Sequence, residues 1–232
     1  MTDRALPFEI SGIRYSICRP DDVAEMVRVL AATFARHDPP AVAVGLTSED
    51  FETFLTIASA TTGDDGLTIV ARDLASGSMA GALLTEDASA PAQLDADAVS
   101  PKFGPIYDLF GELEESIGDT APIEPGTTVH LFMLGVDERF AGHGIAQRLV
   151  EACLSNAATL GYRQAITEAT NLVSQHIFAK LGFTSRARAS YAEYRRDGVA
   201  VFASIAQHGG IMSMARGVSG AMSRFPGHVT VP

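Results

Sequence analysis

One stretch of the chain has the clearest pattern of apolar and polar positions. Val129 to Val136 is an apolar run of strand length, and a short segment containing Gly142 and Gly144 follows it. Apolar residues then recur at helical spacing along the next segment, at Ile145, Leu149, Ala152, Cys153, Ala157 and Leu160. The pattern predicts a strand, a glycine loop and a helix, in that order.

The same reading predicts the elements that precede this stretch. They are, in chain order, a strand over 14–18, a helix from 21 to about 34, a helix from 48, a turn over 62–66, and a hairpin of strands over 67–72 and 79–85. Because proline cannot extend a helix, Pro39 and Pro40 are expected to hold the chain in an extended turn between the first two helices.

A long insertion is expected at about 88–123. Its second part has apolar residues at helical spacing, at Phe103, Ile106, Tyr107, Phe110, Leu113 and Ile117. These residues predict an amphipathic helix that either lines a pocket or packs on the sheet. The pattern does not separate these two roles, because both use the same side chains.

The last third of the chain continues the alternation of strands and helices. We expect a strand over 164–170, a short helix over 174–181, and an antiparallel pair of strands over 185–195 and 199–206. The domain is expected to span 1–208. A C-terminal tail over 209–232 follows, where a stripe of apolar residues predicts a short amphipathic helix, at Ile211, Met214, Ala215, Val218, Met222 and Phe225.

Composition limits the kinds of protein that this chain can be. Its 232 residues are 47% hydrophobic and 19% charged, which indicates a globular chain of one domain. A formal charge of −11 argues against nucleic acid and anionic membranes as partners. No signal-type apolar stretch follows Met1, so a cytoplasmic location is expected. Two cysteines are too few for a disulfide framework, no residue cluster has metal-ligand spacing, and both a monomer and a homodimer remain possible.

The glycine loop is a candidate phosphate site. A helix N-terminus carries unpaired N–H groups and a partial positive charge, and glycine lets a ligand approach the backbone. A phosphate-bearing ligand is therefore expected at residues 141–146. No Gly-Lys-Ser/Thr follows, which excludes a Walker A loop, and Gln147 stands where a dinucleotide fingerprint needs glycine.

Two segments resemble signatures of the GNAT acetyltransferase superfamily. The first runs from Leu134-Gly135-Val136 to Ala146, and the second from Asn171 to Gly182-Phe183. The resemblance covers residues 12–208 and is nearest to the arylalkylamine branch. It implies an α/β (α+β) fold with a mixed, mainly antiparallel sheet of six to seven strands flanked by helices. It also implies acetyl-CoA as cosubstrate, held by Leu134, Gly135, Val136, Arg139, Ala141, Gly142, His143, Gly144, Ile145, Ala146, Asn171 and Phe178.

Two residues depart from the family pattern. Ala141 stands where the family usually has arginine or glutamine, so a donor to the pyrophosphate is missing, and Arg139, His143 or Arg148 would have to compensate. Phe178 stands where many members have a tyrosine that protonates the leaving thiolate. Phenylalanine cannot donate a proton, so Ser174 or water would replace it.

Three residues are candidates for the proton transfers. Histidine has a pKa suited to proton transfer near neutral pH, and His130 shares a strand face with Phe132 and, without a bulge, with Leu134. The alternative is that His130 is a structural histidine at the start of the strand. Asp38 matches the base of the dopamine-acetylating branch, although an aspartate before proline is also a common turn residue. Ser174 matches a hydroxyl position of the same branch, and both it and Asn171 are also suited to capping a helix. Glu168 either binds an ammonium group or is a solvent-exposed residue at the end of a strand.

The sequence therefore predicts an acetyl-CoA-dependent N-acetyltransferase of a small primary amine, arylalkylamine or polyamine-like, acting in a ternary complex without a metal. Two alternatives remain. The departures at Ala141 and Phe178 fit a non-catalytic acyl-CoA-binding regulatory module. An open groove would fit a protein or peptide N-acetyltransferase.

Overall fold

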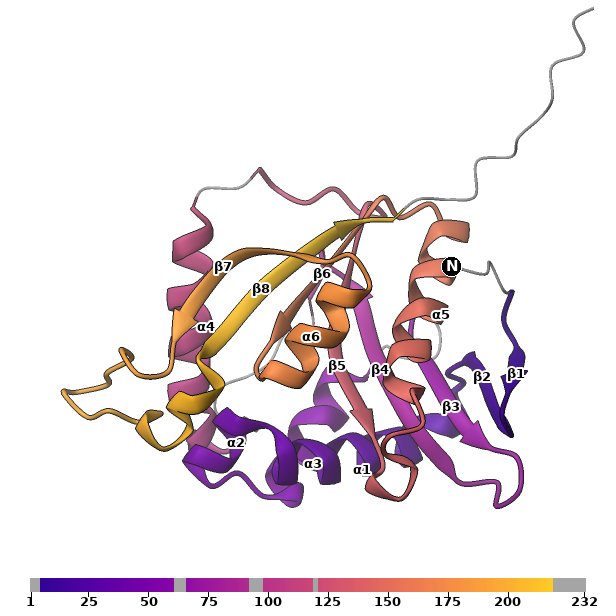
Figure 1. The fold of residues 1–232 in the computed structure, drawn as a ribbon, viewed down its shortest axis with the longest axis horizontal. Coiled ribbons are helices and arrows are strands. Elements are labelled where there is room, and N and C mark those ends of the chain that lie inside the picture. Colours follow the sequence, from indigo (N-terminus) through magenta and orange to yellow (C-terminus); the bar gives the residue numbers. More distant parts are fainter. Residues whose placement is uncertain (1–4, 61–65, 92–97, 119–120, 219–232) are drawn as a thin grey trace, which may run out of the picture.

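A mixed sheet of eight strands forms the centre of the computed structural model, which describes residues 5–60, 66–91, 98–118 and 121–218 (Figure 1). The strands are β1 (Phe8–Ile10), β2 (Ile13–Ile17), β3 (Ile69–Asp73), β4 (Met79–Asp87), β5 (Thr128–Val136), β6 (Gln164–Ala169), β7 (Thr184–Ser190) and β8 (Gly210–Gly217). Their order across the sheet is β1-β2-β3-β4-β5-β6-β8-β7. Within these described strands, β5 and β6 alone pair in parallel. The expected mixed, mainly antiparallel sheet is confirmed, and it has eight strands where six to seven were expected.

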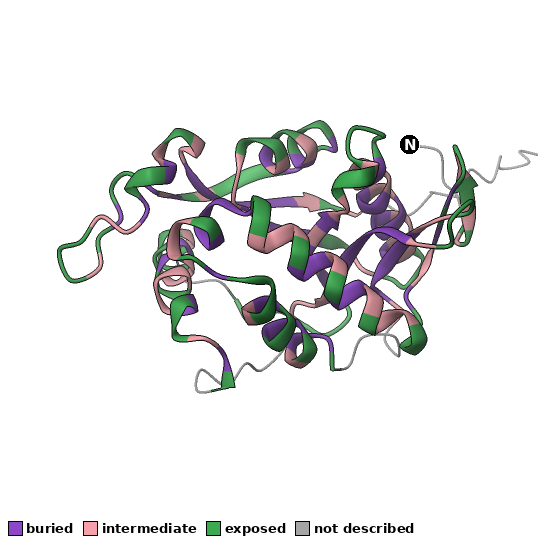
Figure 2. Cartoon of the chain, turned by 90° about the horizontal axis from the view of Figure 1, so that it is seen from below, coloured by how far each residue is buried: buried purple, intermediate pink, exposed green. Residues whose placement is uncertain are grey.

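Helices cover both faces of this sheet. They are α1 (Pro20–His37), α2 (Pro39–Val44), α3 (Ser48–Ala58), α4 (Gly104–Ile117), α5 (Ile145–Thr159) and α6 (Leu172–Lys180), with single turns η2 (Pro101–Phe103), η3 (Glu138–Phe140) and η4 (Ala203–His208). One core lies between the sheet and α5 and α6, a second lies under α1 and α3, and a third joins α4 to β7 and β8. The central strands are largely buried beneath helices whose outer faces are exposed, whereas the edge strands β1 and β7 are more exposed (Figure 2). In the described part of the chain, none of the helices combines the length and apolar character that crossing a bilayer requires.

The chain between α1 and α3 differs from the expected extended turn. α1 runs three residues beyond Phe34, Asp38 is extended, and the two prolines then open the helix α2. Proline fits the first turn of a helix, where its missing N–H would have no partner. The carboxylate of Asp38 caps this helix by accepting the N–H of Ala41 at 3.1 Å. Of the turn expected over 62–66, residues 62–65 lie outside the described residues.

The C-terminal strands are the largest correction. The strand expected over 185–195 ends at Ser190, and 199–206 contains turns and part of η4 instead of a strand. The partner of β7 is β8, which lies between β6 and β7. The amphipathic helix predicted for the tail is wrong for 210–217, because these residues form β8. The sheet therefore continues past residue 208. A strand paired on both edges and mostly buried has a nearly continuous apolar run, and over a few residues this run matches helical spacing equally well. Residues 219–232 of the predicted tail lie outside the described residues.

A β-bulge in β5 decides which side chains share a face. Leu84 of β4 pairs with Met133, and the next residue, Thr85, pairs with Leu131, so Phe132 is the extra residue. The bulge reverses the alternation along the strand. Phe132 and Met133 consequently face α1 and α3, whereas Leu131 and Leu134 pack on the core under α5. The ring of His130 contacts that of Phe132 at 5.4 Å between centroids, so His130 shares a face with Phe132 and not with Leu134.

β5 and β6 separate immediately after they pair. Their register runs through three pairs and ends at His130 and Ile166, although both strands continue. Beyond this point no further backbone pair joins the two strands in the described ladder, although the Thr167 hydroxyl donates to the Leu131 carbonyl oxygen at 2.9 Å. The strands therefore splay apart here, next to the bulge.

Candidate active site

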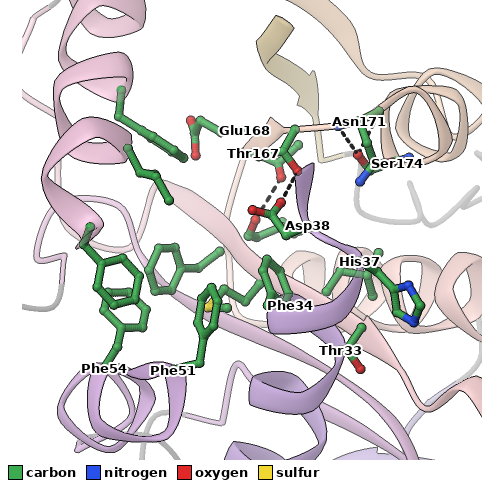
Figure 3. A pocket seen from close by; sticks show the side chains of 18 of the residues that line it. Thr33, Phe34, His37, Asp38, Phe51, Phe54, Thr167, Glu168, Asn171 and Ser174 are labelled. Carbon is green, nitrogen blue, oxygen red and sulfur yellow. Dashed lines mark hydrogen bonds between the residues drawn. The ribbon is translucent and has the colours of Figure 1, made fainter. Parts of the chain in front are cut away.

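A cavity of about 240 Å³ lies where β5 and β6 separate, on the face of the sheet that α1 and α3 cover. α1, α3, α4, both strands and the start of α6 contribute to its walls (Figure 3). The lining residues are Thr33, Phe34, His37, Asp38, Phe51, Phe54, Phe103, Ile106, Tyr107, Phe110, Leu131, Phe132, Met133, Leu134, Thr167, Glu168, Thr170, Asn171, Ser174 and Phe178. The cavity brings together three of the predicted site regions, namely the end of α1, the strand β5 and the start of α6.

Aromatic rings form most of its apolar wall. Phe51 and Phe54 of α3 contact Phe103 with centroids at 5.4 and 5.0 Å, and Phe103 stacks on Tyr107 at 5.9 Å. The ring of Phe132 closes the group against Phe54 at 6.0 Å. These rings bury one another, so the wall is rigid and suits a flat or apolar ligand.

The helix of the insertion has both of the roles that the sequence left open. Its residues Leu109 and Leu113 are buried against Tyr191 and Phe202 near the end of the sheet. Another side of the same helix, with Ile106 and Tyr107, lines the cavity. α4 therefore packs on the fold and closes the cavity at the same time.

Asp38 places a carboxyl group in this wall. It is 9% exposed, and its Oδ1 accepts a hydrogen bond from the hydroxyl of Thr170 at 2.6 Å. Burial raises the pKa of Asp38, and the hydrogen bonds from Thr170 and from the Ala41 N–H, together with the charge of His208, lower it in part. The resulting pKa is about 6. A group with this pKa is ionised at neutral pH and close to the range in which a base transfers protons efficiently. Asp38 thus both caps α2 and faces the cavity.

Asn171 and Ser174 form a capping box at the start of α6, two residues earlier than the helix was expected to begin. The side chain of Asn171 accepts the N–H of Ser174 at 2.9 Å, and the Ser174 hydroxyl donates to the Asn171 carbonyl at 2.9 Å. Both residues also line the cavity. Phe178 lies one helical turn further on, 3% exposed and packed against Phe183 at 5.1 Å between centroids. Its position is part of the core, which explains why an apolar ring fits there.

His130 is held between two carboxylates. Its Nδ1 lies 2.9 Å from Oε1 of Glu86, and its Nε2 lies 2.7 Å from Oε2 of Glu168. Burial alone would lower the pKa of His130, but the hydrogen bonds and charges of Glu168 and Glu86 outweigh burial and raise this pKa to about 9. At neutral pH the ring is therefore a cation with both nitrogens engaged, and a cation has no lone pair with which to accept a proton. Glu168 lines the cavity, while His130 and Glu86 are not among the described residues that line it.

The glycine loop has the backbone that anion binding requires. Gly142 and Gly144 have φ values of +79° and +73°, a conformation that other residues rarely adopt. Gly144 is the N-cap of α5, so the first N–H groups of that helix are free of intrahelical partners. Ala141 and the loop residues up to Gly144 are exposed, whereas Ile145 is buried in the core.

The side chains expected to compensate for Ala141 are only partly free. Arg139 makes two hydrogen bonds to Asp137, from Nε at 3.0 Å and from Nη2 at 2.8 Å. His143 lies next to the loop with its Nδ1 3.2 Å from the Phe140 carbonyl oxygen. The exposed backbone of the loop is therefore its main set of donors.

Sequence reasoning missed several residues of the site. Glu86 was not considered, because its link to His130 depends on the pairing of β4 with β5. Phe51 and Phe54 are buried residues of α3 that also form cavity walls, which the sequence did not predict. Their spacing of three residues on an amphipathic helix marked them as neighbours, but it did not indicate an adjacent cavity.

Comparisons with known proteins agree with this arrangement. The model of the acetyltransferase (GNAT) family matches residues 106–183, which run from α4 through the glycine loop to the end of the second signature. This segment contains the bulged strand, the loop and the start of α6.

Solved structures resemble the whole fold. Arylalkylamine N-acetyltransferase 2 from Aedes aegypti has a TM-score of 0.77 at 23% identity, over 90% of this chain and 100% of that one. The C-terminal condensation domain of Ebony, solved with beta-alanyl-dopamine, has a TM-score of 0.80 at 16% identity, over 89% and 99%. A Drosophila melanogaster polyamine N-acetyltransferase, which forms N-acetylagmatine, has a TM-score of 0.67 at 17% identity, over 88% and 99%. At these identities the likeness shows a shared fold.

Proposed function

We propose that this chain is an acyltransferase that transfers an acetyl group from acetyl-CoA to a small primary amine, and the match of residues 106–183 to the acetyltransferase (GNAT) family supports this proposal. The transfer occurs directly, with both substrates bound. The observation that carries the proposal is the buried carboxylate of Asp38 in an aromatic cavity that begins at the separation of β5 and β6. The position of Asp38 supports its role as a base, because it lies beside the gap between β5 and β6, where the thioester enters in this proposal.

Acetyl-CoA binds along the separated strands in this account. The pyrophosphate lies on the backbone of residues 141–146, and the pantetheine arm pairs with the free edge of β5 near Leu134 and, through Asn171, with the start of α6. The β5–β6 ladder ends at His130 and Ile166, so the thioester oxygen can accept from backbone N–H groups of β5 beyond that point, beside Leu134. Phe178 contributes an apolar wall near the sulfur.

Asp38 acts as the general base. The incoming ammonium gives a proton to the carboxylate, directly or through water, and the nitrogen lone pair then attacks the thioester carbon. The new C–N bond forms as the C–S bond breaks, and the nitrogen gives up its second proton, which passes to the departing thiolate directly or through water, so coenzyme A leaves as the thiol and needs no dedicated acid. The Ser174 hydroxyl lines the same cavity and is the nearest candidate to protonate the sulfur. His130 is already protonated at neutral pH and is not the base in this account.

The substrate is a small amine with an apolar body. α4 and α3 close the cavity opposite the sheet, which leaves room for a small molecule and disfavours a protein chain as substrate. The ring walls favour an arylalkylamine over a polyamine, because a polyamine would bring additional charged groups into an apolar space.

The test is release of coenzyme A thiol from acetyl-CoA with a panel of amines: tyramine, phenethylamine, 1,4-diaminobutane, agmatine and a lysine peptide. We expect turnover with the aromatic amines and little with the peptide. Acetyl-CoA that binds and raises the unfolding temperature, but that reacts with none of the amines, would contradict the catalytic proposal and favour a binding module. Turnover confined to the peptide would contradict the substrate proposal.

A further inference from the structure

The pair of carboxylates around His130 has no part in the reaction proposed above. Glu86, His130 and Glu168 come from three neighbouring strands, and Glu86 and His130 are directly paired in the register of β4 and β5. Their side chains are 18%, 15% and 19% exposed, so three ionisable groups are largely withdrawn from water. Such an arrangement costs desolvation free energy, and it is stable here because the opposite charges are in contact.

The geometry gives the three residues different positions relative to the cavity. Glu168 lines the cavity, whereas His130 and Glu86 lie behind it in the row. His130 donates from Nε2 to Oε2 of Glu168, which fixes the carboxylate and leaves its other oxygen without this contact. With one imidazolium between two carboxylates the row has a net charge of −1. Glu168 therefore remains a strong acceptor in spite of its ion pair.

We propose that Glu168 is the residue that selects the far end of the substrate, accepting a hydrogen bond from a hydroxyl group on the ring of an arylalkylamine. His130 is the positioning residue that holds Glu168 in place, and Glu86 contacts the other ring nitrogen of His130, away from the cavity. The inference rests on the proposed function, because it assigns one end of the same cavity. It also explains why a strand that enters the active cavity carries a buried carboxylate that the acetyl transfer does not use.

Two observations favour a hydroxyl group over a second ammonium. Phe54, Phe103 and Phe132 line the cavity with Glu168, so an aromatic ring that carries a hydroxyl group can pack on them while the hydroxyl reaches the carboxylate. A phenolic hydroxyl has one hydrogen to donate and brings an aromatic ring for those walls. The two carboxylates also belong to neighbouring parts of one wall, because Asp38 contacts Thr170, Glu168 precedes Thr170 by two residues, and all three line the cavity.

The experiment compares tyramine with phenethylamine, which lacks only the hydroxyl. We expect the wild-type kcat/KM to favour tyramine by about tenfold or more, because the site loses a charge-assisted hydrogen bond with phenethylamine. In Glu168→Gln this preference should fall to about threefold or less, mainly through the KM of tyramine, with the kcat for phenethylamine nearly unchanged. Glu86→Gln is the matched control, since it removes the other carboxylate of His130 without touching the cavity, and it should retain the preference.

Several outcomes would overturn the inference. Equal use of both amines by the wild type would do so, as would an equal loss of the preference in Glu86→Gln and Glu168→Gln. A wild-type preference for 1,4-diaminobutane that is lost in Glu168→Gln would assign Glu168 to a second cation instead. If no amine turns over, the proposed function has failed, and calorimetric binding of tyramine and phenethylamine to the CoA-saturated protein still tests the inference. Tighter binding of tyramine that Glu168→Gln abolishes would support it.

Discussion

Asp38 and His130 show how two environments on one face of a sheet assign different chemistry to two titratable side chains. Asp38 is buried with neutral donors, so its pKa rises to about 6 and it can exchange a proton near neutral pH. His130 is buried with two carboxylates, so its pKa rises to about 9 and its proton is retained. Histidine is the more common base in proteins, but here the carboxylate is better suited to the task.

The retained proton of His130 predicts how stability depends on pH. Because the pKa in the folded protein, about 9, lies above the ordinary value of 6.5, the imidazolium stabilises the fold fully below pH 6.5, and this contribution is lost as the pH rises through 9. The shift corresponds to about 3 kcal/mol at most. Urea unfolding at pH 6, 7.5 and 9.5 should show wild-type stability falling over this range.

The variant His130→Gln isolates this effect, because glutamine cannot be charged. Its free energy of unfolding should be lower than that of the wild type at pH 6, and its pH dependence between pH 6 and 9.5 should be much flatter. A variant whose stability falls with pH as steeply as the wild type's would show that His130 is not the group that titrates.

At the scale of elements, the glycine loop and the bulged strand shape the site through backbone conformation. The loop directs backbone N–H groups outward because Gly142 and Gly144 adopt positive φ angles, and the bulge turns Phe132 toward the cavity. The loop was predictable from the strand–glycine–helix pattern, since that pattern is local. The bulge was not, because a bulge is a property of the register between two strands and leaves no local mark in either sequence.

Gly144→Ala tests the loop. Alanine at a φ of +73° costs about 1–2 kcal/mol, and a shift of the α5 N-terminus should raise the KM for acetyl-CoA. Gly77→Ala is the matched control. Its φ is +72°, a Cβ there also meets nothing within 4 Å, and it lies in the β3–β4 turn. Both variants should lose similar stability in urea, while the KM for acetyl-CoA rises in Gly144→Ala alone. An equal KM in the two variants would argue against a phosphate site at this loop.

Gly135→Ala tests the contact between β5 and α1, the helix that leads to Asp38. A Cβ at Gly135 would lie 2.8 Å from Cδ2 of Leu30, a fully buried side chain, so we expect a loss of about 1–3 kcal/mol in unfolding free energy and a lower kcat. Gly111→Ala in α4, where a Cβ meets nothing within 4 Å, should instead stabilise the protein by up to about 1 kcal/mol. If Gly111→Ala lowered the unfolding free energy as much as Gly135→Ala does, the clash with Leu30 would not explain the loss in Gly135→Ala.

The same scale explains the wrong assignments near the C-terminus. The segment 199–206 is an almost continuous apolar run but forms turns and part of η4, while Ile211, Met214 and Ala215 have helical spacing but belong to β8. A strand in the interior of a sheet needs neither a polar face nor an exposed edge, so its sequence lacks the alternation that identifies strands near the surface. Which of two apolar segments inserts next to β6 is decided by tertiary pairing.

At the scale of the whole molecule, the cavity combines segments that are far apart in sequence. Asp38 and Thr170 are 132 residues apart and share a hydrogen bond, and Glu86 and Glu168 meet through His130 between them. The sequence predicted each of these segments and the fold class, because local periodicity and the two signatures specify them. It did not predict which side chains converge, since convergence depends on the sheet order and on the placement of α4.

The central claim is that Asp38 is the base of an acetyl transfer in this cavity, and the dependence of kcat/KM on pH tests it most directly. With an aromatic amine as substrate, the wild-type kcat/KM should rise with pH through an inflection near 6, because the carboxyl must lose its proton before it can accept one. Asp38→Asn should lack this inflection and be slower by about 10²–10⁴-fold. An Asp38→Asn variant with the wild-type rate and the wild-type inflection would contradict the account.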